Sequence, residues 1–178
     1  MRHPCAGTDN TVVTLENLVD IDAAQVERWL AEFVTFGAHG ETGVWRTVYT
    51  PEWVAAADRY AEWCHESGLA AYRDAVGNVW GRLDGREGGK AIVSGSHIDT
   101  VTPGGRYDGA LGAVGALIAV ASLARQFGPP RKPLEAVALC EEESSRFPAN
   151  FWGSRAIIGG IGRDDPEKIV GHDRTTIA

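Results

Sequence analysis

The stretch SGSHIDTVTPGGRYDG, which begins at Ser94, most constrains what this chain can fold into. It places one histidine and two aspartates, His97, Asp99 and Asp108, in a turn-rich segment between two apolar runs. The run before it, KAIVSGS, has the length and composition of a strand, and the run after it, GALGAVGALIAVASLAR, has those of a helix. In open α/β sheets, the loops that leave the carboxyl ends of strands line the ligand crevice. The stretch therefore predicts polar side chains gathered at one edge of a sheet.

Further strands and helices are predicted on both sides of this stretch. An apolar face with helical spacing predicts a helix that starts near Asp22, and Thr50 followed by proline predicts the start of a second helix over 51–67. We expect the aromatic stripe of this second helix to be core and not a cofactor site. Strands are predicted for LAAYRDA, NVWGRLDG, KAIVSGS and LEAVALC, and a last helix over 154–160. This alternation predicts an α/β fold with a mixed, largely parallel central sheet flanked by helices.

Three consecutive acids, Glu141, Glu142 and Glu143, follow the strand LEAVALC directly. Three buried carboxylates could not all be ionised cheaply, so either the segment is a solvated acidic loop or a cation neutralises it. The His-x-Asp pattern at His97 and Asp99 supports a cation. An imidazole binds divalent metals, and a nearby carboxylate can hold its second ring nitrogen. Two strand-plus-loop units that both end in metal-type ligands therefore favour a metal site.

Composition and charge exclude several classes of protein. The net charge of −7 argues against nucleic acid or an anionic membrane as a partner. The apolar run over 109–123 is shorter than a membrane span and rich in Gly and Ala, so we expect a buried core helix. Residues 1–12 contain no apolar signal segment and are expected to be a disordered start. Three cysteines without a CxxC pair fit a reducing compartment. We therefore expect a soluble cytoplasmic protein.

The motifs GSHIDTV, GGRYDG and CEEESSRF, followed by FWGSRAI, occur here in this order. They resemble the hydantoinase/carbamoylase group of dinuclear-metal amidohydrolases, which contains allantoate amidohydrolases, ureidoglycolate amidohydrolases and N-carbamoyl-L-amino acid hydrolases. The resemblance covers about Val34 to Gly160, and FPANFWGS is most similar to the allantoate amidohydrolases. It implies an aminopeptidase-like catalytic domain that cleaves a ureido or carbamoyl C–N bond of a small molecule.

The resemblance also implies roles for individual residues. His97 and Glu143 would each bind one of two divalent ions, Mn²⁺ or Zn²⁺, and Asp108 would bridge them. Glu142 would be the general base, and Asp99 would orient His97. Related enzymes commonly have a cis peptide after the bridging aspartate, which here is the bond that follows Asp108.

The assignment within the acid triplet depends on alignment of the run SSRF, which selects Glu142 and Glu143. Glu141 is then a spare acid, which we expect to be solvated or salt-bridged. Ser144 replaces the usual glycine and would be strained if that position requires a positive φ. Two interpretations of Arg146 remain open, of which we favour a local ion pair with Glu141 over a clamp for a substrate carboxylate.

Members of the group are more than twice as long as this chain. They have a second domain and two further histidine ligands, one of them in an HIEQGP-like motif that is absent here. We do not expect His39, His65 or His172 to replace these ligands.

We therefore predict that residues 13–178 form the N-terminal portion of a catalytic domain, and that the second domain, for lid and dimer contacts, is absent from the chain. The rest of the enzyme or a partner chain would complete the site and cover the sheet near LEAVALC or its neighbours, and the full-length enzyme would be a homodimer. The alternative is a binding or regulatory module that keeps the fold without turnover.

Overall fold

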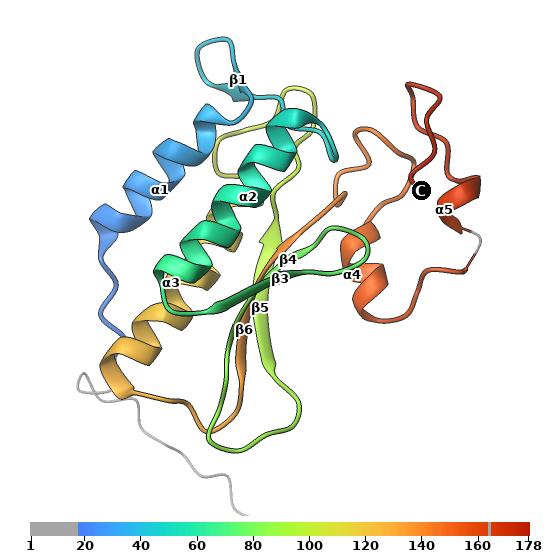
Figure 1. The fold of residues 1–178 in the computed structure, drawn as a ribbon. Coiled ribbons are helices and arrows are strands. Elements are labelled where there is room, and N and C mark those ends of the chain that lie inside the picture. Colours follow the sequence, from blue (N-terminus) through green and yellow to red (C-terminus); the bar gives the residue numbers. More distant parts are fainter. Residues whose placement is uncertain (1–17, 164) are drawn as a thin grey trace, which may run out of the picture.

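The fold is taken from a computed structural model that describes residues 18–163 and 165–178 (Figure 1). The expected disordered start at residues 1–12 lies outside the described residues. The elements in chain order are α1 (Ala23–Thr35), β1 (Ala38–His39), β2 (Gly43–Val44), α2 (Pro51–Glu66), β3 (Ala70–Arg73), β4 (Val79–Leu83), β5 (Ile92–His97), α3 (Ala110–Phe127), β6 (Leu134–Leu139), α4 (Trp152–Ile157) and α5 (Asp165–Lys168).

The main sheet has four strands in the order β3-β4-β6-β5, and β1 and β2 form a separate small pair. The predicted mixed α/β class is confirmed. The expected predominance of parallel pairing is not found among the described strands, because β5 and β6 are parallel while β3–β4 and β4–β6 are antiparallel. For β3 and β4 the reason is the short connection between them, closed by the Gly77 amide, which donates to the Asp74 carbonyl at 3.0 Å. A turn of this length permits a hairpin but not a crossover.

The helices α1, α2 and α3 lie together on one side of the sheet, and α4 and α5 lie on the other (Figure 1). The aromatic stripe of α2 is part of the core, as predicted, since Trp53, Tyr60 and Trp63 are all buried. Trp63 stacks on Trp29 of α1 with ring centroids 4.6 Å apart. The predicted cap is also present, because the Thr50 hydroxyl accepts the Trp53 amide.

Helix α3 is long and apolar enough to cross a membrane by length and composition alone. It contacts both β5 and β6, however, and many of its residues are buried. Gly112 permits this packing, because a Cβ there would lie 2.6 Å from the Cβ of Ser96 on β5. The expected buried core helix is confirmed.

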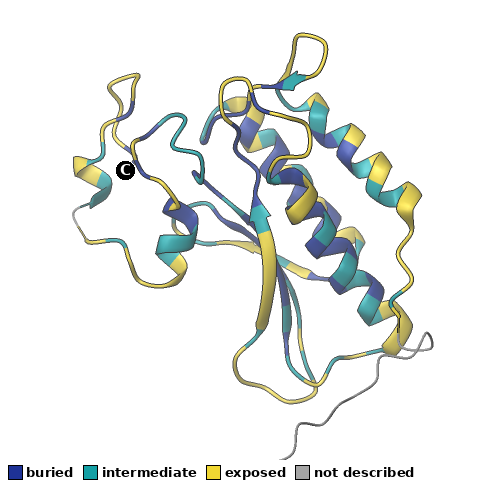
Figure 2. Ribbon diagram, turned by 180° about the vertical axis from the view of Figure 1, so that it is seen from behind, coloured by how far each residue is buried: buried dark blue, intermediate teal, exposed yellow. Residues whose placement is uncertain are grey.

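Strands β3 and β5 are the two edges of the sheet, and β5 is drawn largely in yellow, as exposed, in Figure 2. Ile92 is 62% exposed and Val93 is 46% exposed. The neighbouring strand β6 is mostly buried. We expected the segment LEAVALC or its neighbouring strands to be partly exposed. The exposed residues are found on β5, the strand beside β6.

Asn78 connects the hairpin to the segment that follows β6. Its side chain is fully buried. The amide nitrogen Nδ2 donates to the Gly153 carbonyl at 3.0 Å and to Asp74 Oδ2 at 2.8 Å. The amide oxygen Oδ1 accepts the Cys140 backbone N–H at 3.0 Å. Asn78 thus fixes the backbone immediately before the acid triplet.

We predict that Asn78→Ala lowers the free energy of unfolding by about 2–4 kcal/mol, because buried backbone groups of Cys140 and Gly153 would lose their partner. Urea unfolding of the purified chain measures this. The control Asn150→Ala, which changes an exposed amide, should stay within about 0.5 kcal/mol of the wild type. Equal effects of the two variants would contradict the role given to Asn78.

Candidate metal centre

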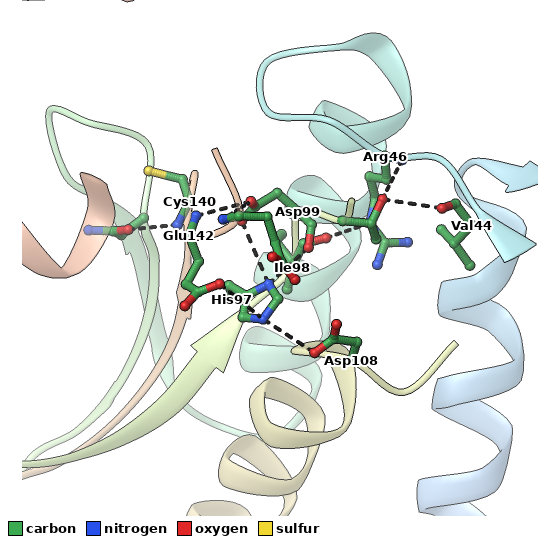
Figure 3. A network of polar contacts seen from close by, with 11 residues as sticks. Val44, Arg46, His97, Ile98, Asp99, Asp108, Cys140 and Glu142 are labelled. Atoms are coloured by element: carbon green, nitrogen blue, oxygen red, sulfur yellow. Dashed lines mark hydrogen bonds and ion pairs between the residues drawn. The ribbon is translucent and has the colours of Figure 1, made fainter. Parts of the chain in front are cut away.

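The parallel pair β5–β6 brings the predicted site residues together. His97, the last residue of β5, is paired with Leu139 at the end of β6. Because the two strands are parallel, their carboxyl ends lie side by side, and the loops that follow them leave the sheet at the same end. The Nε2 atom of His97 lies 3.7 Å from Asp108 Oδ1 and 3.8 Å from Glu142 Oε2 (Figure 3).

Glu143 completes the cluster. One potential ligand atom from each of His97, Glu142 and Glu143 lies within 4.8 Å of the others. The pKa of Glu143 is raised, first by burial and then by the neighbouring carboxyls of Asp108 and Glu142, while His97 opposes the shift. One imidazole nitrogen and three carboxylates form a donor set that suits divalent ions such as Zn²⁺ and Mn²⁺. A possible metal-binding group is therefore present.

Asp99 contacts His97 in a different way from the one expected. The Asp99 backbone carbonyl accepts the His97 Nδ1–H at 2.9 Å, whereas the carboxyl oxygen Oδ1 lies 3.9 Å from Nδ1. With Nδ1 carrying the proton, Nε2 keeps its lone pair and can act as a ligand.

The Asp99 carboxylate instead holds the acid triplet. Its Oδ2 accepts the backbone amides of Glu142 at 3.0 Å and Glu143 at 3.1 Å. Burial raises the pKa of Asp99, and the two amides and His97 oppose that shift. Oδ1 is buried without a hydrogen-bond partner among the described residues. Asp99 therefore ties the end of β5 to the loop after β6.

The sequence analysis missed Arg46, a cation buried behind the site. Its Nε donates to the Ile98 carbonyl at 2.7 Å, and its Nη1 donates to the carbonyls of Phe33 and Phe36 at the end of α1, at 2.8 and 2.9 Å. Burial lowers its pKa to about 10, and the charge of Asp99 opposes this. The sequence signal for this role was an arginine in the short run VWRTV, where valines and a tryptophan surround it.

Two expectations about the acid triplet are wrong. Glu141 is neither solvated nor salt-bridged but fully buried, and its Oε1 accepts the Phe147 amide at 2.8 Å. Arg146 pairs with Asp173, at 3.0 Å from Nη2 to Oδ2, and not with Glu141. The chain after α5 returns to this loop, where the His172 amide donates to the Arg146 carbonyl. This long-range contact supplies the partner that local sequence could not indicate.

Backbone geometry around the site agrees with one expectation and contradicts another. Ser144 has a φ of 56°, so a position that favours glycine does carry a serine. The expected cis peptide between Asp108 and Gly109 is wrong, because the cis bond among the described residues joins Thr102 and Pro103. Gly109 makes the turn with a φ of 63°, and a Cβ there would lie 2.5 Å from the His97 ring. The other described histidines, His39, His65 and His172, are exposed, and the cluster of potential ligands consists of His97, Glu142 and Glu143.

Comparison with known proteins confirms the resemblance. The model of peptidase family M20/M25/M40 matches residues 93–175. The allantoate amidohydrolase of Bacillus subtilis (strain 168) is 45% identical over 141 residues, which cover 79% of this chain and 34% of the relative. The N-carbamoyl-L-amino-acid amidohydrolase of Paenarthrobacter aurescens is 35% identical over 156 residues, which cover 87% of this chain and 38% of the relative.

Part of a solved structure of a hydantoinase/carbamoylase family amidase from Burkholderia ambifaria has a similar fold. It matches with a TM-score of 0.85 and 35% sequence identity, over 90% of this chain and 40% of that chain. The chain thus spans little more than a third of the length of the curated relatives that it matches.

The buried Glu141 predicts a pH-dependent stability for the metal-free chain. Burial raises its pKa from 4.5 to about 7, against the opposing effect of the Phe147 amide. Between these values the folded chain keeps a proton that the unfolded chain releases, so stability is fully present below pH 4.5 and falls as the pH rises to about 7. Urea unfolding across this range should give a smaller loss for Glu141→Gln than for the wild type. Glu27→Gln, at an exposed position of α1, serves as the control, and an unchanged loss in Glu141→Gln would contradict the assignment.

Proposed function

Because this chain is related to the hydantoinase/carbamoylase amidohydrolases, we propose that it is the N-terminal part of an enzyme that cleaves a ureido or carbamoyl C–N bond. The proposed substrates are allantoate or an N-carbamoyl-L-amino acid, and the proposed location is the cytoplasm. The observation that carries the proposal is the convergence of His97, Asp108, Glu142 and Glu143 at the ends of β5 and β6 (Figure 3).

We propose that two divalent ions, Mn²⁺ or Zn²⁺, occupy this cluster, with His97 and Glu143 as ligands and Asp108 between the ions. The donor set fits, because the Nε2 lone pair of His97 is available and the pKa of Glu143 is raised by burial and by neighbouring carboxyls that a cation would offset. When bound, the ions would polarise the substrate carbonyl and lower the pKa of a water molecule.

Glu142 is the proposed general base. Its carboxylate accepts a proton from the attacking water, whose oxygen bonds to the carbonyl carbon, and delivers that proton to the leaving nitrogen as the C–N bond breaks. Asp99 supports this role as a positioning residue, because its Oδ2 fixes the backbone amides of Glu142 and Glu143. Orientation of this kind contributes to rate by holding the base in reach of the proton.

The open edge at β5 supports the view that further chain completes the enzyme. The unpaired backbone groups of an edge strand are a template for another strand, and Ile92 and Val93 beside them are exposed. We propose that the rest of the longer protein, or a partner chain, adds to the sheet here and brings further metal donors, and that the complete enzyme is a homodimer. The alternative function, a metal-binding module without turnover, is favoured by the single histidine that the described residues place in the cluster.

Loss of the proposed bridge should weaken both metal ions. We expect Asp108→Ala to lower the Mn²⁺ affinity of the purified chain at least about tenfold at both sites, because each ion loses a ligand. Isothermal titration and elemental analysis measure affinity and stoichiometry. The control is Asp84→Ala, at an exposed position just after β4, where β4 pairs with the start of β6 and not with the end that carries the cluster. Two tightly bound ions in Asp108→Ala would refute the bridging role.

Turnover should require both Glu142 and the downstream polypeptide. We expect the chain alone to show no turnover of allantoate or N-carbamoyl amino acids with added Mn²⁺. Joined to the rest of the protein it should be active. There, Glu142→Gln should keep its metal and lose about two to four orders of magnitude in kcat. Turnover by the isolated chain that Glu142→Gln abolishes would contradict this account, and metal binding without turnover by the complete protein would favour the binding module.

A further inference from the structure

The loop over 141–152, here called the acidic loop, is closed at its base by a ladder of backbone hydrogen bonds. The Gly153 amide donates to the Cys140 carbonyl at 2.9 Å, Trp152 donates to Glu141 at 3.0 Å, and Phe151 donates to Glu142 at 3.3 Å. The proposed base therefore lies at the neck of a closed loop and not in a free segment.

The backbone of this loop adopts conformations that ordinary residues rarely take. Glu141, Ser144 and Phe151 have φ values of 44°, 56° and 58°, and they are three of the five non-glycine residues with positive φ in the described part of the chain. Such conformations persist only where the surroundings impose them, and they gather at functional sites. Contacts within the acidic loop are therefore needed to keep these three residues at positive φ.

The side chain of Glu141 occupies the interior of the loop. It is fully buried, and Oε1 accepts the amide of Phe147, which is itself buried. Its other oxygen, Oε2, is buried without a hydrogen-bond partner among the described residues. An apolar side chain would fill the same space without leaving a polar atom unpaired, so the bond to Phe147 is the feature that only an acceptor at this position provides.

From these contacts we propose that Glu141 is a positioning residue, which sets the direction of the Glu142 and Glu143 carboxylates by fastening the start of the acidic loop to Phe147. The inference rests on the proposed function, because it assigns a role within the same site. Asp99 fixes the amides of Glu142 and Glu143 from the β5 side. The side chain of Glu141, the residue before them, is fixed to the Phe147 amide within the loop. Glu141 acts through the backbone and touches neither metal nor substrate.

Amide hydrogen exchange of the metal-free chain tests this role without any assumption about metal. Glu141→Leu keeps the volume and removes the acceptor, while Glu141→Gln keeps an acceptor for Phe147. We expect Glu141→Leu to speed exchange of the Glu142, Glu143 and Phe147 amides at least about tenfold, with β6 and α2 unchanged, and Glu141→Gln to stay near the wild type. Asn150→Ala, which removes the exposed Ser144–Asn150 hydrogen bond of the same loop, is the matched control and should also stay near the wild type.

Mn²⁺ affinity is the second measurement. It should fall about tenfold in Glu141→Leu and be restored in Glu141→Gln. Unchanged exchange in Glu141→Leu, or equal damage in both Glu141 variants, would overturn the proposal. If the wild-type chain binds no Mn²⁺, the proposed metal centre fails, and the exchange data still decide the role of Glu141. If Glu141→Leu does not fold, Glu141→Asp, which is too short to reach Phe147, replaces it with the same expectations.

Discussion

The candidate site depends on the two hydrogen bonds that the Asp99 carboxylate accepts from the amides of Glu142 and Glu143. They connect the end of β5 to the loop after β6, where parallel pairing has already placed the two strand ends side by side. A buried carboxylate is costly unless such partners are present. Here the two amides and His97 offset part of that cost, and burial still raises the pKa of Asp99. If this connection were lost, His97 would remain on its strand while the acids on the other side would no longer be held against it.

Electrostatics explains why the same arrangement suits a cation. The carboxyls of Asp108, Glu142 and Glu143 gather around a single imidazole, and the pKa of Glu143 is raised by burial and by its acidic neighbours. Like charges held this close destabilise one another until a positive charge lies between them. The guanidinium of Arg46 is directed toward other groups, because its Nε and Nη1 donate to the carbonyls of Ile98, Phe33 and Phe36. The cluster is thus acidic, while the buried cation behind it is bonded to backbone carbonyls.

The sequence predicted the features that depend on residues close together in the chain. Apolar periodicity located α1, α2, α3 and the four strands of the main sheet, and Thr50 marked the start of α2. The order of the charged motifs identified the residues that meet at the ends of β5 and β6. The two failures in the acid triplet have different causes. Glu141 is buried because an irregular loop closes on Phe147, six residues later, and no helical or strand periodicity encodes such a loop. Arg146 pairs with Asp173 because the chain after α5 returns to it, a contact between residues distant in sequence. The balance of parallel and antiparallel pairs also depends on which strand lies beside β4. That strand is β6, and no residue pattern within β4 predicts this pairing.

The central claim is that the ends of β5 and β6 form a metal-binding half-site presented by Asp99 and the acidic loop. Anomalous diffraction at the manganese edge, from crystals of this chain grown with Mn²⁺, tests it most directly. The account predicts anomalous density beside His97 Nε2, within coordinating distance of Asp108 and Glu143, with the Glu142 and Glu143 amides still bonded to Asp99. Manganese bound elsewhere on the chain, with His97 and Glu143 left without a metal at saturating Mn²⁺, would contradict it.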